Sequence, residues 1–289
     1  MGKIKSIIKL FRVKHYLKNL LIFLPLFFSG EFLSINIVKA VLAFITFCLL
    51  SSAIYILNDI CDYKNDRQHP TKSERPIANG TVSKKEAFII MFACFIAGVI
   101  LCIFTSRRII TFVYPLLYVL INILYSIKLK NVPIVDIALL TSGFFIRVLY
   151  GGAVVDVPVS SWLYLTITAI AFYMVLGKRK KELDKNPEGN TRQVLKAYTS
   201  EFLDKFMYVC MTLAIVFYSL WAKNLENSVM IWTVPLVILI AMKYSLDINK
   251  PESDGDPIEV ILSDIPIILM LAVYAVTAVL VIYLPIIYR

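Results

Sequence analysis

The sequence predicts an all-α integral membrane protein, built as a bundle of about nine transmembrane helices. Its 289 residues are 59% hydrophobic and their mean hydropathy is +0.75, which is more apolar surface than a soluble domain can bury. Several nearly uncharged stretches reach the ~20 residues that a helix needs to cross a hydrocarbon layer of ~30 Å. Positive charge is concentrated in alternate connecting segments, as in membrane proteins of fixed orientation.

Runs of apolar residues set the positions of the expected helices. Helices are expected at 17–33, 37–57, 87–105, 109–127, 134–154, 159–177, 206–222, 228–246 and 264–287. Barrel strands do not explain these runs, because such strands alternate over only ~10 residues. The first run resembles a signal peptide, but it has no clear A-x-A cleavage site and many spans follow, so we expect it to be retained. Residues 1–289 are predicted to form one membrane domain.

The connecting segments divide the positive charge unevenly. Most of the 30 Lys and Arg residues lie at the N-terminus and in the loops after even-numbered spans. This positive-inside pattern predicts that the N-terminus and those loops are cytoplasmic, in a multi-pass protein of the cell membrane. The net charge of +10 is thereby explained without a nucleic-acid partner. The sequence carries no signal for an oligomeric state.

A cluster of acidic residues ends the second expected span. The stretch NDICDYKNDRQHPTKSERP begins at Asn58. If the helix continues, its polar side chains share one face, namely Ser51, Tyr55, Asn58, Asp59, Asp62 and Asp66. Like charges on one face destabilise a helix, whereas Mg²⁺ binds through one or two carboxylates and leaves positions for phosphate oxygens. A solvated acidic loop is the alternative, and the extension of the polar face back to Ser51 disfavours it.

The remainder of this loop is basic. It carries Lys64, Arg67, Lys72, Arg75, Lys84 and Lys85. Carboxylates for a metal beside cations for phosphate predict a metal–diphosphate site. The candidate catalytic residues are Asp59, Asp62 and Asp66, which together with Asn58 are also the candidate metal ligands. Tyr55 and Arg75 are candidate substrate contacts.

The segment 58–66 resembles the first signature, N-D-x-x-D-x-x-x-D, of the UbiA-type prenyltransferase superfamily. The match is complete and directly follows a membrane span, and the resemblance covers essentially the whole chain. It implies a helical bundle with an active site at the cytoplasmic face and Mg²⁺ as the cofactor.

The loop after the sixth expected span departs from the usual pattern of that superfamily. Members that bind a prenyl diphosphate carry a second aspartate cluster there, whereas this chain reads LGKRKKELDK from Leu176. Lys178 and Glu182 share a helix face, and Asp184 lies off it. One carboxylate cluster and one cationic cluster suit a donor with a metal-bound diphosphate and a further phosphate. A basic surface patch for anionic lipid is the alternative, chiefly for Lys180 and Lys181.

Four segments resemble one branch of the superfamily, the polyprenyl-phosphate phosphoribosyltransferases. They are 11–25, 125–137, 176–183 and 255–264. The branch implies 5-phosphoribosyl 1-diphosphate as donor and a polyprenyl phosphate as acceptor, with membrane lipid around the acceptor's tail. The substrate contacts that it implies are Lys18, Asn19, Tyr125, Lys128, Lys178, Arg179 and Glu182.

The fifth span carries an arginine inside the membrane. Arg147 shares a helix face with Asp136, Gly143 and Tyr150. Asp136 lies three turns away, roughly 16 Å, so we expect it at the cytoplasmic mouth, as a further candidate substrate contact, and not paired with Arg147. Intramembrane arginines normally face a partner or a wet cavity. Two partners are expected with equal weight for Arg147, a lipid-head phosphate or a structural carboxylate of another helix.

The residues and the resemblance together predict phosphoribosyl transfer to a polyprenyl phosphate, with release of diphosphate. The product is a polyprenyl-phosphoryl-5-phosphoribose, a cell-envelope precursor. One alternative is a UbiA-type prenyltransferase that joins a prenyl diphosphate to an aromatic acceptor, since it shares the fold and the first motif. A second is a non-catalytic transporter or lipid-binding protein, for which polar groups near the bilayer midplane would be expected.

Overall fold

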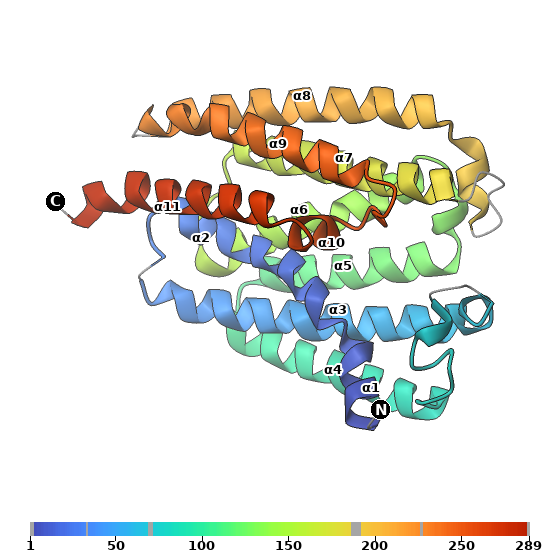
Figure 1. Cartoon of the computed structure of the whole chain (residues 1–289). Coiled ribbons are helices and arrows are strands. Elements are labelled where there is room, and N and C mark those ends of the chain that lie inside the picture. Colours follow the sequence, from blue (N-terminus) through green and yellow to red (C-terminus); the bar gives the residue numbers. More distant parts are fainter. Residues whose placement is uncertain (1–2, 33, 69–71, 186–191, 226–227, 288–289) are drawn as a thin grey trace. The chain divides into compact units, whose positions relative to one another are not determined.

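The computed structural model describes residues 3–32, 34–68, 72–185, 192–225 and 228–287 (Figure 1). Over these residues it is helical and contains no strand, which confirms the predicted all-α class. Within these described ranges, eight helices are long and apolar enough to cross a membrane. They are α3 (Asn36–Asp66), α4 (Lys84–Thr105), α5 (Ile109–Ile127), α6 (Val135–Val155), α7 (Ser161–Lys185), α8 (Ser200–Asn224), α9 (Val234–Ile248) with the 3₁₀ turn η5 (Ser228–Thr233) before it, and α11 (Ile265–Ile287).

The first expected span, 17–33, is not a single α-helix. It consists of an 11-residue 3₁₀-helix, η1 (Val13–Phe23), that leads directly into the short α2 (Leu24–Phe28). Pro25 lies in the first turn of α2, where its missing N–H removes no helical hydrogen bond. Gly30 has a φ of 80°, a left-handed conformation that ends the segment. Hydropathy alone does not distinguish such a segment from an ordinary membrane helix.

Packing divides the chain into two compact units. The first comprises Met1–Phe27, Glu31–Lys128 and Ile146–Val157, and the second comprises Phe28–Gly30, Leu129–Phe145 and Pro158–Arg289. The predicted single domain over residues 1–289 stays a prediction.

The first unit is organised around α3. Helix α4 packs along α3, which α5, η1 and α1 (Lys3–Phe11) also contact (Figure 1). The 3₁₀-helix runs antiparallel to α3, as four successive contacts show: Arg12 with Asp59, Tyr16 with Ser52, Asn19 with Cys48, and Phe23 with Phe44. A small apolar core of Leu10, Ile56, Ile77, Val82 and Ala87 fixes α1 against the end of α3 and the loop that follows it.

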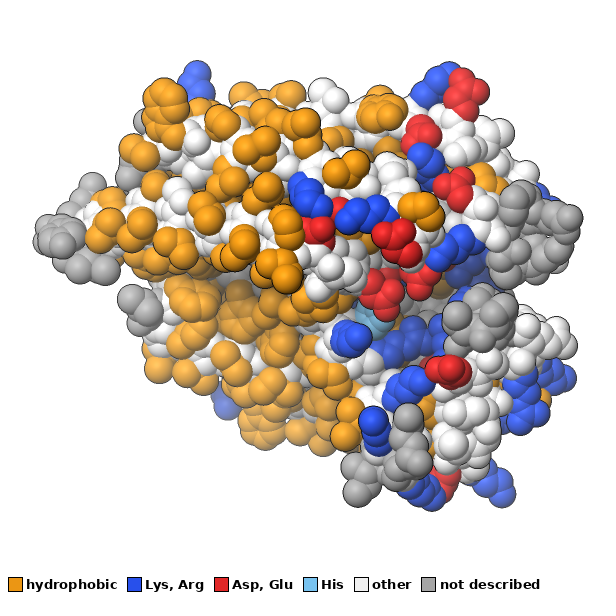
Figure 2. Space-filling view, in the orientation of Figure 1, with side chains coloured by type: hydrophobic (Ala, Val, Ile, Leu, Met, Phe, Trp, Pro, Cys, Tyr) orange, Lys and Arg blue, Asp and Glu red, His pale blue; other side chains and the backbone are white. Residues whose placement is uncertain are grey.

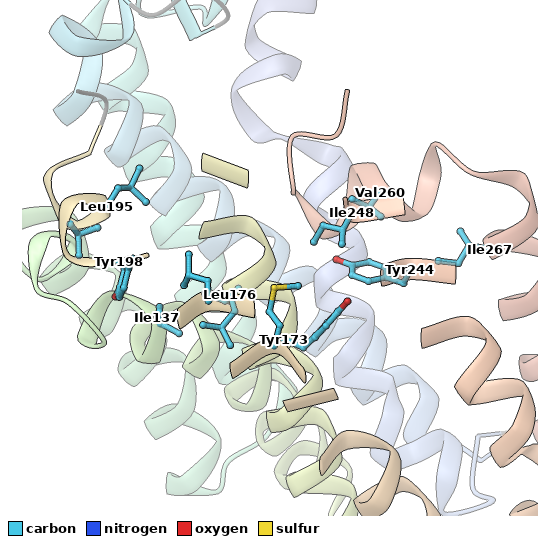
Figure 3. Close-up of a cluster of buried hydrophobic side chains, with 13 residues drawn as sticks. Ile137, Tyr173, Leu176, Leu195, Tyr198, Tyr244, Ile248, Val260 and Ile267 are labelled. Carbon is cyan, nitrogen blue, oxygen red and sulfur yellow. The ribbon is translucent and has the colours of Figure 1, made fainter. Parts of the chain in front are cut away.

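The second unit is organised around α7 and α8, which pack along each other. Its core draws on α6, α7, α8, α9, α11 and two short elements, η4 (Gln193–Ala197) and α10 (Pro257–Leu262). Figure 3 shows this core, in which the rings of Tyr173 on α7 and Tyr244 on α9 lie 5.8 Å apart and Leu176 lies beside Ile137. Gly177 permits this close packing, because a Cβ there would clash with Ile248 Cδ1.

The lateral surfaces of both units are apolar. Exposed hydrophobic side chains follow α4 in the first unit and α9 and α11 in the second, and Figure 2 shows those of α9 and α11 in orange. Examples are Phe92, Ile96 and Ile103 on α4, Leu239 and Met242 on α9, and Leu269 and Val273 on α11. A surface of this extent requires a hydrocarbon solvent, so the chain is a multi-pass membrane protein.

Candidate functional site

Helix α3 continues beyond the expected end at residue 57 through the acidic motif to Asp66, and ends in a cluster of two aspartates and two arginines. Arg75 Nη1 donates to Asp59 Oδ1 at 3.1 Å and to Asp66 Oδ2 at 2.8 Å. Arg12 Nη2 donates to the same Asp59 oxygen at 2.5 Å. The aspartate side chains are 3% and 6% exposed, and those of the arginines about a quarter. We call these four residues the carboxylate–arginine cluster.

Arg12 reaches this cluster from the junction between α1 and η1. Its backbone is left-handed, with φ 50° and ψ 51°, a conformation that L-residues other than Asn and Asp rarely adopt. Its guanidinium lies 5.1 Å from the centre of the Tyr55 ring on α3, within cation–π range. Tyr55, predicted as a substrate contact, therefore supports an arginine in this structure.

Arg75 is held by a compactly folded loop. The loop begins with the turn η2 (Lys72–Glu74), and the Arg75 carbonyl accepts from Asn79 N–H at 2.9 Å. Arg67 Nε donates to the Ala78 carbonyl at 2.9 Å, and Val82 N–H donates to the Pro76 carbonyl at 3.0 Å. The loop ends at Ser83, where Ser83 and Glu86 form a capping box for α4.

The predicted metal ligands do not converge as one set. Asn58 Oδ1 accepts from Ser126 Oγ of α5, which turns the amide toward a neighbouring helix. Asp62 is half-buried on α3, and the described residues hold no group of three His, Cys, Asp or Glu placed as ligands of one ion. Asp59 and Asp66 do converge on a single cation, Arg75 Nη1. Two carboxylates fit Mg²⁺, which takes its other ligands from water and phosphate.

Asn19 and Arg147 meet in the interior of the first unit. Arg147 Nε donates to Asn19 Oδ1 at 2.7 Å, and Arg147 Nη2 donates to Tyr118 Oη at 3.3 Å. Asn19 Nδ2 in turn points at Cys48 Sγ and Ser51 Oγ on α3. Asn19 and Tyr118 are neutral, and the expected contact of Arg147 with a phosphate or a carboxylate stays a prediction. Because Asn19 is fully buried, a contact with substrate phosphate would require these hydrogen bonds to break.

The other predicted contacts of the first unit lie nearer its surface. Lys18 and Tyr125 are half-buried, and Lys128 is exposed at the C-terminal end of α5. Their roles toward substrate stay predictions.

In the second unit, Arg179 is a buried structural cation. Its side chain is 1% exposed; Nε donates to Asp136 Oδ2 at 2.7 Å and Nη1 to Glu182 Oε2 at 2.6 Å. Tyr198 Oη donates to the other Asp136 oxygen at 2.5 Å. Burial and this hydrogen bond to Asp136 raise the pKa of Tyr198. Arg179 and Asp136, both predicted to contact substrate, are thus joined to each other.

Tyr198 also holds a strained residue. Ile134 has a φ of 68°, which is unfavourable for a β-branched side chain, and its N–H donates to Tyr198 Oη at 2.6 Å. Since η4 ends just before Tyr198, this hydroxyl ties η4 to the start of α6. Tyr198 was not predicted as a functional or structural residue, because a single tyrosine outside any motif does not indicate its partners.

Lys178 is the most accessible cation of the run 178–181. Its side chain is 35% exposed, and Nζ donates to Asp256 Oδ2 at 3.2 Å. Asp256 caps α10 by accepting from Ile258 N–H. Gly255, with a φ of 71°, presses this loop onto α7, because a Cβ there would lie 3.1 Å from Lys178 Cα.

The two lysines after Arg179 contact other residues of the second unit. Lys180 Nζ forms an ion pair with Asp204 at 2.6 Å. Lys181 is buried and donates to the carbonyls of Asn249 and Lys250. The alternative of a solvated patch for anionic lipid does not fit these two side chains.

The chain is similar to known proteins in both sequence and fold. The model of the UbiA prenyltransferase family matches residues 19–265. The chain is 30% identical to decaprenyl-phosphate phosphoribosyltransferase of Mycolicibacterium smegmatis over 90% of this chain and 87% of that protein. Its fold is similar to a UbiA homolog from Archaeoglobus fulgidus, with a TM-score of 0.71, 18% identity and coverage of 96% and 99%. That homolog bound to GPP and Mg²⁺ gives a TM-score of 0.70 at 19% identity, with the same coverage.

Arg179→Met is expected to destabilise the protein, because it leaves Asp136 as a buried charge without its cation. Breaking a buried pair costs ~3–5 kcal/mol, whereas Lys180→Met, which removes a more exposed ion pair, should cost less than ~1 kcal/mol. Thermal unfolding of both variants in detergent measures the difference. Adding Asp136→Asn to Arg179→Met should recover part of the loss. Equal melting temperatures for the two single variants would contradict the assignment of Arg179 as a structural cation.

Proposed function

Because the chain belongs to the UbiA prenyltransferase family, we propose that it transfers a 5-phosphoribosyl group from 5-phosphoribosyl 1-diphosphate to a polyprenyl phosphate. Relatives named decaprenyl-phosphate phosphoribosyltransferase, which align with 90% of the chain, support this donor and acceptor. The products are diphosphate and a polyprenyl-phosphoryl-5-phosphoribose, a precursor for the cell envelope.

The observation that carries the choice of donor is the cationic run on α7. Carboxylates at this position would suit a second metal ion on a prenyl diphosphate, whereas an accessible ammonium suits a phosphate bound directly. Lys178 combines partial exposure with a carboxylate partner that fixes its position. We therefore assign the donor's 5-phosphate to Lys178. Glu182, which Arg179 holds, remains a candidate for the ribose hydroxyls.

The carboxylates of the first unit are assigned to the diphosphate end of the donor. Asp59 and Asp66 would hold Mg²⁺, with Asp62 as a further candidate, and the solved homolog with GPP and Mg²⁺ supports the use of a divalent ion. The ion, when bound, supplies positive charge to the departing diphosphate. Arg12 and Arg75, which contact these two carboxylates, would add donors for phosphate oxygens.

The reaction needs little help from a general base. The acceptor phosphate is already an anion at pH 7, and one of its oxygens forms the new bond to the ribose C1. The bond from C1 to the diphosphate oxygen breaks, and the diphosphate leaves with the electron pair. Positive charge develops at C1, so the protein's task is to orient the donor and to stabilise the leaving group.

In the proposed orientation, the N-terminus and the loops after α3 and α7 lie on the cytoplasmic side of the plasma membrane. The lysines and arginines near these segments support it through the positive-inside rule. The soluble, highly charged donor would then be available from the cytoplasm, and the acceptor's apolar tail would stay in lipid.

Asp66→Asn is expected to lower turnover by at least ~100-fold, because it removes a charged group at the leaving diphosphate. Folding should survive, since Arg75 keeps its contact with Asp59. Asp204→Asn, which alters an ion pair of the second unit, is the control and should retain turnover. Normal turnover by Asp66→Asn at saturating Mg²⁺ would remove the carboxylates from the mechanism.

Lys178→Ala is expected to raise the apparent Michaelis constant for 5-phosphoribosyl 1-diphosphate about tenfold to a hundredfold. A charge-assisted contact contributes ~1.5–3 kcal/mol, which corresponds to that range. The constant for the polyprenyl phosphate should stay nearly unchanged. Lys185→Ala on the same helix, where Lys185 pairs with Asp254, is the matched control. A change in the acceptor's constant alone would assign Lys178 to the other substrate.

A substrate test decides the reaction itself. Purified protein in detergent receives labelled 5-phosphoribosyl 1-diphosphate with a polyprenyl phosphate, and separately a labelled prenyl diphosphate with an aromatic acid. We expect a labelled lipid product in the first reaction and none in the second. The reverse result would identify an aromatic prenyltransferase, and product in neither would favour a non-catalytic protein.

A further inference from the structure

We propose that Arg12 and Arg75 couple the two ligands of the carboxylate–arginine cluster, so that a divalent cation binds there together with a diphosphate and poorly on its own. The inference rests on the proposed metal–diphosphate site. It assigns to the two arginines a role in the order and cooperativity of binding, and Arg12 enters from a segment outside the acidic motif.

The contacts place both arginines on the oxygens that a cation would use. Asp59 Oδ1 accepts from Arg12 at 2.5 Å and from Arg75 at 3.1 Å, and Asp66 Oδ2 accepts from Arg75 at 2.8 Å. Two carboxylates and two guanidinium groups make the cluster neutral. A divalent cation that enters must take oxygens already in use, and it meets two positive charges within a few ångström.

A diphosphate removes both obstacles. It carries several negative charges, and its oxygens accept the paired N–H groups of a guanidinium. When the arginines turn to phosphate oxygens, the aspartate oxygens become available to the cation. The cation and the diphosphate then neutralise each other, so the cluster gains no net repulsion. Each ligand therefore raises the affinity for the other, by the same factor.

Exposure fits this exchange of partners. The aspartate side chains are almost fully buried on α3, whereas both arginine side chains are about one quarter exposed. Arg12 and Arg75 also lie outside α3, at the start of η1 and in the loop after η2. Their side chains can change partner by rotation while the carboxylates stay in place on the helix.

Binding of Mn²⁺ to the purified chain in detergent, followed by electron paramagnetic resonance, tests the coupling without any turnover. The second probe is methylene bisphosphonate, a diphosphate analogue with neither ribose nor prenyl chain. For the unaltered protein we expect weak binding of Mn²⁺ alone and at least tenfold tighter binding with the bisphosphonate present. Asp66→Asn should abolish the bisphosphonate-dependent binding, which identifies the cluster as the site.

The arginine variants should move the two affinities in opposite directions. Arg12→Gln and Arg75→Gln are each expected to tighten binding of Mn²⁺ alone about tenfold, which corresponds to ~1.4 kcal/mol, and to weaken binding of the bisphosphonate. Arg12→Lys keeps the charge and should resemble the unaltered protein. Arg108→Gln is the matched control, because Arg108 is an arginine of the same unit that pairs with Asp156 and takes no part in the cluster.

Weaker or unchanged Mn²⁺ binding by both glutamine variants would overturn the proposal, since the arginines would then help to build the cation site. Each glutamine variant leaves Asp59 with one arginine partner. Melting temperatures of the two variants test whether they are folded. The two variants are independent tests, so a folding failure of one leaves the other. Neither probe depends on the donor, so an error in the phosphoribosyl assignment would leave this result intact.

Discussion

A carboxylate at the edge of hydrocarbon needs a cation or a hydrogen-bond donor in place of water, and this requirement organises both compact units. In the first unit, Asp59 and Asp66 receive arginines from the α1–η1 junction and from the loop after α3. In the second unit, Asp136 receives Arg179 and the hydroxyl of Tyr198. The contacts of Asp59 with Arg12 and of Asp136 with Arg179 and Tyr198 each join residues more than 40 positions apart, and Asp66 with Arg75 closes a loop of nine. The contacts that neutralise the carboxylates are therefore also contacts that hold the tertiary structure together.

The cations differ in how deeply they are buried, and this difference separates structural cations from those that a ligand can reach. Arg179 and Lys181 are buried and complete the interior of the second unit, whereas Lys178 on the same helix keeps about a third of its side chain accessible. In the first unit the arginines are intermediate, because they are partly exposed yet bonded to buried carboxylates. Such partial exposure is suited to groups that change partners when a ligand enters.

Much of the fold and the location of the charged clusters could be predicted from the sequence. Long apolar runs gave α4, α5, α6 and α11 nearly at their observed bounds, and the polar face of α3 did continue to Asp66. Local pattern could not reveal Arg12 as a partner of Asp59, because the two are brought together by the packing of α1. Nor could it show that Arg179 is buried while Lys178 is accessible, since charge is read from sequence and burial is a tertiary property.

The tight winding of η1 determines where Arg12 lies. The contacts of η1 with α3 run from Asp59 back to Phe44, a distance of about 22 Å along an α-helix. The 11 residues of η1 cover about the same distance at ~2.0 Å per residue. An α-helix of those residues would be shorter by roughly 5–6 Å. With its far end anchored, a change from 3₁₀ to α winding would withdraw Arg12 from Asp59 by one helical turn. The rise per residue of η1 therefore determines whether the Arg12 guanidinium reaches Asp59.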